Sequence, residues 1–225
     1  MPRLSIFAAG LLCGMAVTSA QTAEVSAGGK FSFKPLSVEG LVLRDRVVIG
    51  PEFAQKHGIE VPAPFLFKVP RIKDMLRVAK FPDQLGQAYI KIVYGTADEQ
   101  FMESIQFNPM TVDIGPLKQR QQQLARVLKQ SVWPQIIEGQ GNTTIDTLRG
   151  RKIGAFDAVE LIGRYVDVKD ANGTVLTRVV ALMREDSRHG VIATINIATS
   201  MVQASNDTEL EDTVSADILG SVAFE

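Results

Sequence analysis

Alternation of apolar and polar residues is clearest in the last third of the chain. Residues 191–200 alternate with a period of two, with Val191, Ala193, Ile195 and Ile197 on one face, which is typical of a strand with one buried face. Residues 159–169 and 174–184 also predict strands. Turn-forming residues separate them, notably Asn172-Gly173 and the stretch 185–190. These segments predict an antiparallel meander of three strands.

Two other stretches have helical spacing. After Gly115-Pro116, an apolar stripe and a polar side predict a long helix, which we expect to end at Trp133-Pro134. Near the C-terminus, Asn206 with Glu209 three residues later predicts a capped helix. The residues of the long helix are Leu117, Leu124, Val127, Leu128 and Val132 on the apolar stripe, and Lys118, Gln119, Arg120, Gln122, Gln123 and Arg126 on the polar side.

The first half of the chain contains shorter patterns, some typical of strands and others of helices. Residues 41–49, 88–94 and 103–112 predict strands, and Pro51 to Gly58 predicts one short helix. Prolines in 61–70 predict an extended edge or a loop there, because proline removes ladder donors. Four apolar residues at helical spacing predict a further helix, namely Ile72, Met75, Leu76 and Ala79.

This order of elements predicts an α+β protein. The simplest arrangement is a mainly antiparallel sheet packed by the long middle helix and the C-terminal helix. We expect one domain over residues 31–225, because the meander alone has too few strands to build its own core. A division into two domains near 139–144 is the alternative.

The N-terminal residues resemble an export signal. Arg3 precedes a mostly apolar stretch from Leu4 to Val17, and Thr18-Ser19-Ala20 offers small residues for cleavage before Gln21. We expect a signal peptide over 1–20, a polar tether over 21–30, and a periplasmic or secreted mature protein. A retained signal anchor and a lipoprotein attached through Cys13 are the alternatives.

Charge and cysteine content narrow the function classes. The chain has 24 Lys and Arg against 25 Asp and Glu, and loss of Arg3 with the leader leaves 23 − 25 = −2. This balance gives no reason to expect a nucleic-acid partner. Cys13 is the only cysteine, so the mature chain would have neither disulfides nor a thiol nucleophile.

Catalytic and metal-binding patterns are not evident in the sequence. The two histidines, His57 and His189, lack the spacing of a metal site, and the chain has neither a nucleophile elbow nor a phosphate loop. We expect no metal or cofactor and favour a non-enzymatic role. A periplasmic hydrolase with a dispersed site, using either histidine with a carboxylate and a hydroxyl group, is one alternative.

Two groups of residues are candidates for binding. The aromatic side chains of Phe65, Phe67, Tyr89 and Tyr94 suggest a ligand or partner surface, for example in a carrier of small apolar ligands. Core packing is the simpler interpretation of these aromatics. The basic cluster Arg149, Arg151 and Lys152 could contact an anion, although it is also typical of a solvated loop.

The C-terminal third contains a set of turn and hydrophobic patterns. They are Gly154-Ala155-Phe156, Tyr165, Asn172-Gly173, Arg178, the strand 192–199 and Ile218-Leu219-Gly220-Ser221-Val222-Ala223-Phe224. With these patterns the chain resembles the PsbP-like group, which includes the bacterial DcrB-type periplasmic proteins, and Phe31-Ser32-Phe33 lies where such domains often start. The resemblance implies an α/β/α sandwich around an antiparallel sheet and an accessory role, with an envelope protein or a membrane complex as partner. It leaves the oligomeric state open.

Overall fold

The computed structural model describes residues 46–225 apart from 86, 99 and 169–172. The expected signal peptide, the tether and Phe31-Ser32-Phe33 therefore lie outside the described residues. The first part of the predicted strand 41–49 and most of the predicted turn before Gly173 lie outside them as well.

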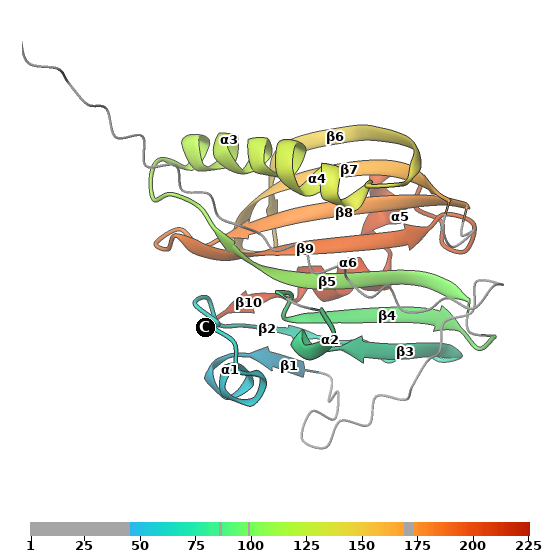
Figure 1. The fold of residues 1–225 in the computed structure, drawn as a ribbon, viewed down its shortest axis with the longest axis horizontal. Helices are drawn as coiled ribbons and strands as arrows, with labels where there is room; N and C mark the ends of the chain where they lie inside the picture. The colour runs from blue at the N-terminus through green and yellow to red at the C-terminus, as the bar shows by residue number, and fades with distance from the viewer. Residues whose placement is uncertain (1–45, 86, 99, 169–172) are drawn as a thin grey trace, which may run out of the picture.

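A seven-stranded antiparallel sheet forms the centre of the fold (Figure 1). The predicted meander is confirmed, because its three strands are neighbours in this sheet. The order across the sheet is β3 (Met75–Lys80), β4 (Ile90–Thr96), β5 (Phe101–Thr111), β9 (His189–Ala198), β8 (Gly173–Met183), β7 (Phe156–Asp167) and β6 (Gly141–Ile153).

A smaller antiparallel sheet has the order β1 (Arg46–Ile49), β2 (Phe65–Lys68) and β10 (Ala223–Phe224). The prediction of an edge or loop over 61–70 is wrong for β2, which is the central strand. Its prolines flank the four strand residues and leave their N–H groups free to pair. The predicted short helix is confirmed as α1 (Pro51–His57), and Gly58 ends it at a φ of 62°.

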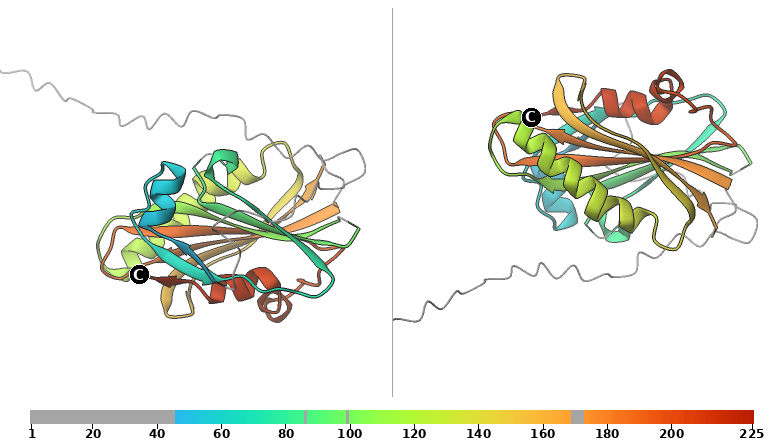
Figure 2. Two further views of the ribbon diagram at one scale, coloured as in Figure 1. Left: turned by 90° about the horizontal axis from the view of Figure 1, so that it is seen from below. Right: turned by 90° about the horizontal axis from the view of Figure 1, so that it is seen from above.

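The middle helix packs on one face of the large sheet, which we call the outer face (Figure 2). It begins as α3 (Leu117–Val127) and continues past the expected end through a π-helical turn, η1 (Leu128–Val132), into α4 (Trp133–Ile136). Pro134 is tolerated because it lies in the first turn of α4, where proline is compatible with helix geometry.

One residue expected on the polar side of this helix is buried. The Arg120 guanidinium donates to the backbone carbonyls of Arg184, Glu185 and Ser187, which belong to the turn between β8 and β9. These bonds pair both terminal nitrogens of a buried guanidinium and fasten α3 to that turn.

The opposite, inner face packs on the small sheet and on the C-terminal helices. The one helix predicted there is two short helices, α5 (Asp207–Glu211) and α6 (Val214–Gly220). The Asn206 side chain accepts from the Glu209 N–H at the start of α5, as predicted. Thr213 caps α6 in the same way by accepting from the N–H of Ala216, which explains the break.

Two further predictions are wrong. Residues 72–79 are not helical, because β3 pairs along its whole length with β4 and alternates its side chains between the two faces. The stretch containing Arg149 and Arg151 is not a loop but part of β6. That strand is polar because it is an edge strand whose exposed residues face water.

The expected fold class is confirmed, with helices on both faces of a mainly antiparallel sheet. Two apolar clusters hold the layers together, one beneath α3 and one between the inner face and the small sheet. A short helix, α2 (Pro82–Leu85), connects β3 to the segment before β4.

Candidate functional site

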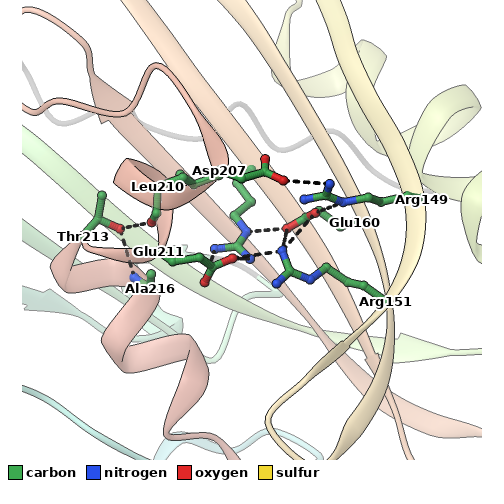
Figure 3. A network of polar contacts seen from close by, with 9 residues as sticks. Arg149, Arg151, Glu160, Asp207, Leu210, Glu211, Thr213 and Ala216 are labelled. Atoms are coloured by element: carbon green, nitrogen blue, oxygen red, sulfur yellow. Dashed lines mark hydrogen bonds and ion pairs between the residues drawn. The ribbon is translucent and has the colours of Figure 1, made fainter.

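A cluster of six charged side chains joins three strands to α5 (Figure 3). All of them lie on the inner side of the large sheet, where α5 packs. We call it the charge cluster; its members are Arg149 and Arg151 on β6, Glu160 on β7, Arg178 on β8, and Asp207 and Glu211 on α5.

The centre of the charge cluster is a fully buried ion pair. Arg178 Nε lies 2.7 Å from Glu160 Oε1, and neither side chain is exposed. Glu160 also accepts from Arg149 Nε at 2.8 Å and from Arg151 Nη1 at 3.2 Å. These contacts follow from strand register, because Arg149 is the cross-strand partner of Glu160.

Two carboxylates of α5 complete the cluster. Glu211 Oε1 accepts from Arg178 Nη2 at 2.8 Å and from Arg151 Nη1 at 2.9 Å. Asp207 Oδ2 lies 2.8 Å from Arg149 Nη1. The hydrogen bond from Arg149 lowers the pKa of Asp207, and the same bond raises the pKa of Arg149.

The charge cluster is internally neutral, with three arginines facing three carboxylates. It can fix α5 on the sheet, because charge-assisted hydrogen bonds are strong where water is excluded. The anion contact expected at Arg149, Arg151 and Lys152 stays a prediction. The geometry does not favour it, since both arginines already bind carboxylates and the exposed Lys152 pairs with Asp157 at 3.1 Å.

Sequence reasoning did not identify Glu160 and Arg178 as members of a site. A signal was present, because each is a charged residue at an inward position of a strand that is otherwise apolar. Glu160 lies between Ala158 and Ile162 on the same face, and Arg178 is the cross-strand partner of Ile162. A buried charge at such a position requires a partner.

The aromatic candidates form part of the core. Phe65, Phe67, Tyr89 and Tyr94 are all buried in the apolar cluster of the inner face, and the ligand or partner surface expected there stays a prediction. The rings of Phe65 and Tyr89 lie 5.9 Å apart. The Tyr94 hydroxyl donates to the Pro70 carbonyl, and burial raises the pKa of Tyr89 to about 12.

The two histidines lie in different settings. His57 at the end of α1 stacks on Phe81 with ring centroids 5.4 Å apart, and His189 begins β9. Within the described residues, no three His, Cys, Asp or Glu side chains are arranged to hold a metal ion. The helices in this part of the chain are all too short or too polar to cross a membrane.

A row of polar side chains crosses the outer face of the large sheet away from α3. Lys80 on β3 pairs with Lys91 on β4, Lys91 pairs with Gln106 on β5, and Gln106 pairs with Thr194 on β9. We call these four residues the lysine row. All four are half-buried, and none belongs to the apolar cluster beneath α3.

The lysine row is not electrically balanced. Burial and, to a smaller extent, the nearby charge of Lys80 together lower the pKa of Lys91 to about 8. Burial also lowers the pKa of Lys80. Neither ammonium group has a carboxylate partner in the part of the chain that the structure describes. This arrangement can accept negative charge from outside, which the charge cluster cannot.

Comparison of the sequence with known families and curated proteins gives no match. Several solved structures are similar to this chain at low sequence identity. The solution structure of PsbP (CyanoP) from the cyanobacterium Synechocystis sp. PCC 6803 has 10% identity and a TM-score of 0.41, with coverage of 84% of this chain and 98% of that one. The resemblance to PsbP expected from the sequence is thus also found among solved structures.

Two other solved structures are similar at comparable levels. LpqN, described as involved in cell envelope biogenesis of Mycobacterium tuberculosis, has 17% identity and a TM-score of 0.43, with 80% of this chain and 90% of that one covered. The Ran-binding protein Mog1p of Saccharomyces cerevisiae has 14% identity and a TM-score of 0.39, with coverage of 71% and 89%.

Proposed function

We propose that the protein is an exported, non-enzymatic binding protein of the cell envelope, and that it docks a partner protein on the outer face of β3, β4, β5 and β9. The observation that carries this proposal is the lysine row, in which two lysines face each other on neighbouring strands of the outer face. The partner completes the charge balance that this face lacks.

The outer face has two halves of opposite character. Beneath α3, the positions of β7 and β8 are apolar and buried, for example Leu161 and Val179. Farther along the same face, Val179 pairs with Thr194, where the lysine row begins. Antiparallel sheets commonly pack one face and leave the other polar, but here the change occurs within one face. The members of the lysine row are half-buried, so their side chains are partly accessible to another protein.

A protein partner fits this half better than a small molecule. Small-molecule sites are concave and mostly apolar, with a few convergent polar groups. The lysine row instead spreads its polar groups over four neighbouring strands, which lie about 4.8 Å apart in a sheet. This spread of side chains favours a protein partner, which contacts many residues over a broad surface.

Export is the second part of the proposal. The basic start, the apolar stretch and the small residues up to Ala20 support cleavage before Gln21. Mass spectrometry of the protein isolated from its host is expected to find Gln21 at the mature N-terminus. Recovery of Met1 through Ala20 on cytosolic protein would contradict export.

The docking face can be tested by site-specific photo-crosslinking in the host. A photoreactive amino acid placed at Gln106 or at Thr194 is expected to capture the same envelope protein. The matched control is Gln122, an exposed position on α3. The proposal fails if neither sheet position captures a protein, or if Gln122 captures the same one equally well.

A further inference from the structure

Lys80 and Lys91 are directly opposed in adjacent strands. Side chains in this relationship have Cβ atoms about 5 Å apart, and like charges placed there destabilise a sheet. Two ammonium groups at this spacing therefore cost stability in the free protein. An anion placed between them would remove that cost.

The neighbours in the row do not supply the anion. Gln106 and Thr194 continue the row as neutral side chains, and Gln106 Nε2 donates to Asn108 Oδ1 on its own strand at 2.9 Å. The adjacent row of the same face contains no acidic residue, since it consists of Val78, Val93, Ser104 and Asn196. Neither of these two rows therefore supplies a compensating negative charge.

Resting on the proposed function, we propose that Lys80 and Lys91 recognise an acidic segment of the partner protein, with a carboxylate held between the two ammonium groups. Gln106 on the next strand offers a neutral polar contact to the same segment. The two lysines then contact negative charge on the partner, and Gln106 contacts an uncharged polar group next to it.

The chemistry of the row favours polypeptide carboxylates over phosphate. Phosphate sites commonly use converging backbone N–H groups or the bidentate fork of arginine. Here the backbone groups of β4 are engaged in ladders on both sides, so the face offers side chains alone. Lysine ammonium groups are compact point charges on long stems, which suit single carboxylates spaced along a chain.

The test is a titration of the intact protein with a hexaglutamate peptide at low salt, followed by calorimetry. Hexaglutamine is the uncharged control peptide, and inorganic phosphate is the competing anion. The variants are Lys80→Met, Lys91→Met and the double substitution, with Lys129→Met as the matched control, because Lys129 is an exposed lysine outside the row.

We expect hexaglutamate to bind about threefold more weakly to each single variant and about tenfold more weakly to the double variant. Lys129→Met should bind as the unaltered protein does, and hexaglutamine should not bind. The thermal midpoint of Lys91→Met should equal or exceed that of the unaltered protein, because the substitution removes like-charge repulsion. This second measurement separates lost recognition from lost folding.

Unchanged hexaglutamate binding by the folded double variant would overturn the inference, as would tighter binding of inorganic phosphate than of the peptide. These results differ from failure of the proposed function. If the crosslink from Gln106 persists in the double variant, the docking face stands and the role of the lysines is wrong. If no crosslink forms at all, the docking face itself is wrong.

Discussion

Arg178 on β8 and Glu160 on β7 form a salt bridge of 2.7 Å in which both side chains are completely buried. Burial of either charge alone would be very costly, and each is stabilised by the other and by the remaining members of the charge cluster. The cluster therefore couples the stability of the sheet to the packing of α5 against it.

Removal of one partner of this pair should greatly lower the free energy of unfolding. Arg178→Met leaves Glu160 with two partly exposed arginines and without its buried one, so we expect a loss of about 3 to 5 kcal/mol in the free energy of unfolding. Urea denaturation measures this. The double variant Arg178→Met, Glu160→Leu should lose less than Arg178→Met alone, because no unpaired charge stays buried. Equal losses would show that the pair contributes through packing alone.

The exposed end of the charge cluster should contribute much less to the free energy of unfolding. The Asp207 side chain is 60% exposed, so Asp207→Asn should cost less than about 1 kcal/mol, and the cost should shrink at high salt. Glu211→Gln should cost more, since Glu211 contacts the buried Arg178. Paired urea curves at low and high salt check this order. The reverse order would mean that Asp207 is the main attachment of α5.

Glu103 on β5 should give a pH-dependent contribution to stability. Its carboxylate accepts from the N–H groups of Val214 and Ser215 at the start of α6, and burial raises its pKa above 4.5. The folded protein then binds a proton at higher pH than the unfolded chain does. Stability contributed by Glu103 is therefore greatest at acidic pH and declines as the pH rises through the raised pKa.

Comparison with Glu103→Gln isolates this effect. The difference in free energy of unfolding between the unaltered protein and the variant should shift in favour of the variant as the pH rises from 4 toward neutrality. Urea denaturation across this range measures the difference. A shift in the opposite direction would mean that the two N–H groups outweigh burial and lower the pKa.

Gly163 on β7 should not tolerate a side chain. A Cβ there would lie 2.5 Å from Trp133 Cη2 and would also overlap the Thr144 carbonyl oxygen. We expect Gly163→Ala to lower the free energy of unfolding by about 1 to 3 kcal/mol through overpacking. Gly220→Ala is the control, because nothing lies within 4 Å of its Cβ position. Similar losses in both variants would show that the contact with Trp133 is not the cause, because the lower unfolded-chain entropy of alanine would by itself stabilise the protein.

The sequence predicted the elements whose pattern is local. The meander of β7, β8 and β9, the cap at Asn206 and the helix from Leu117 all follow from periodicity and turn chemistry. The segment 72–79 was wrongly predicted to be helical, because its apolar residues fit both periods and pairing with β4 decided the outcome. β6 was missed because its residues are polar on both sides.

The sites depend on register, which one sequence does not reveal. Lys80 and Lys91 belong to no sequence motif, and only the pairing of β3 with β4 places them opposite each other. Arg149 and Arg151 were recognised as a basic cluster, but the carboxylates that neutralise them come from another strand and a distant helix.

The gathering of arginines from both neighbouring strands around Glu160 also selects one alignment of the edge strand. β6 has two irregularities in its pairing with β7, so several alignments of its polar residues would otherwise compete. A slip by one residue would turn Arg149 and Arg151 to the opposite side and leave a carboxylate short of positive charge in the interior. The charge cluster thus favours the native alignment of β6 over its alternatives, and we expect misaligned chains to aggregate or to be degraded.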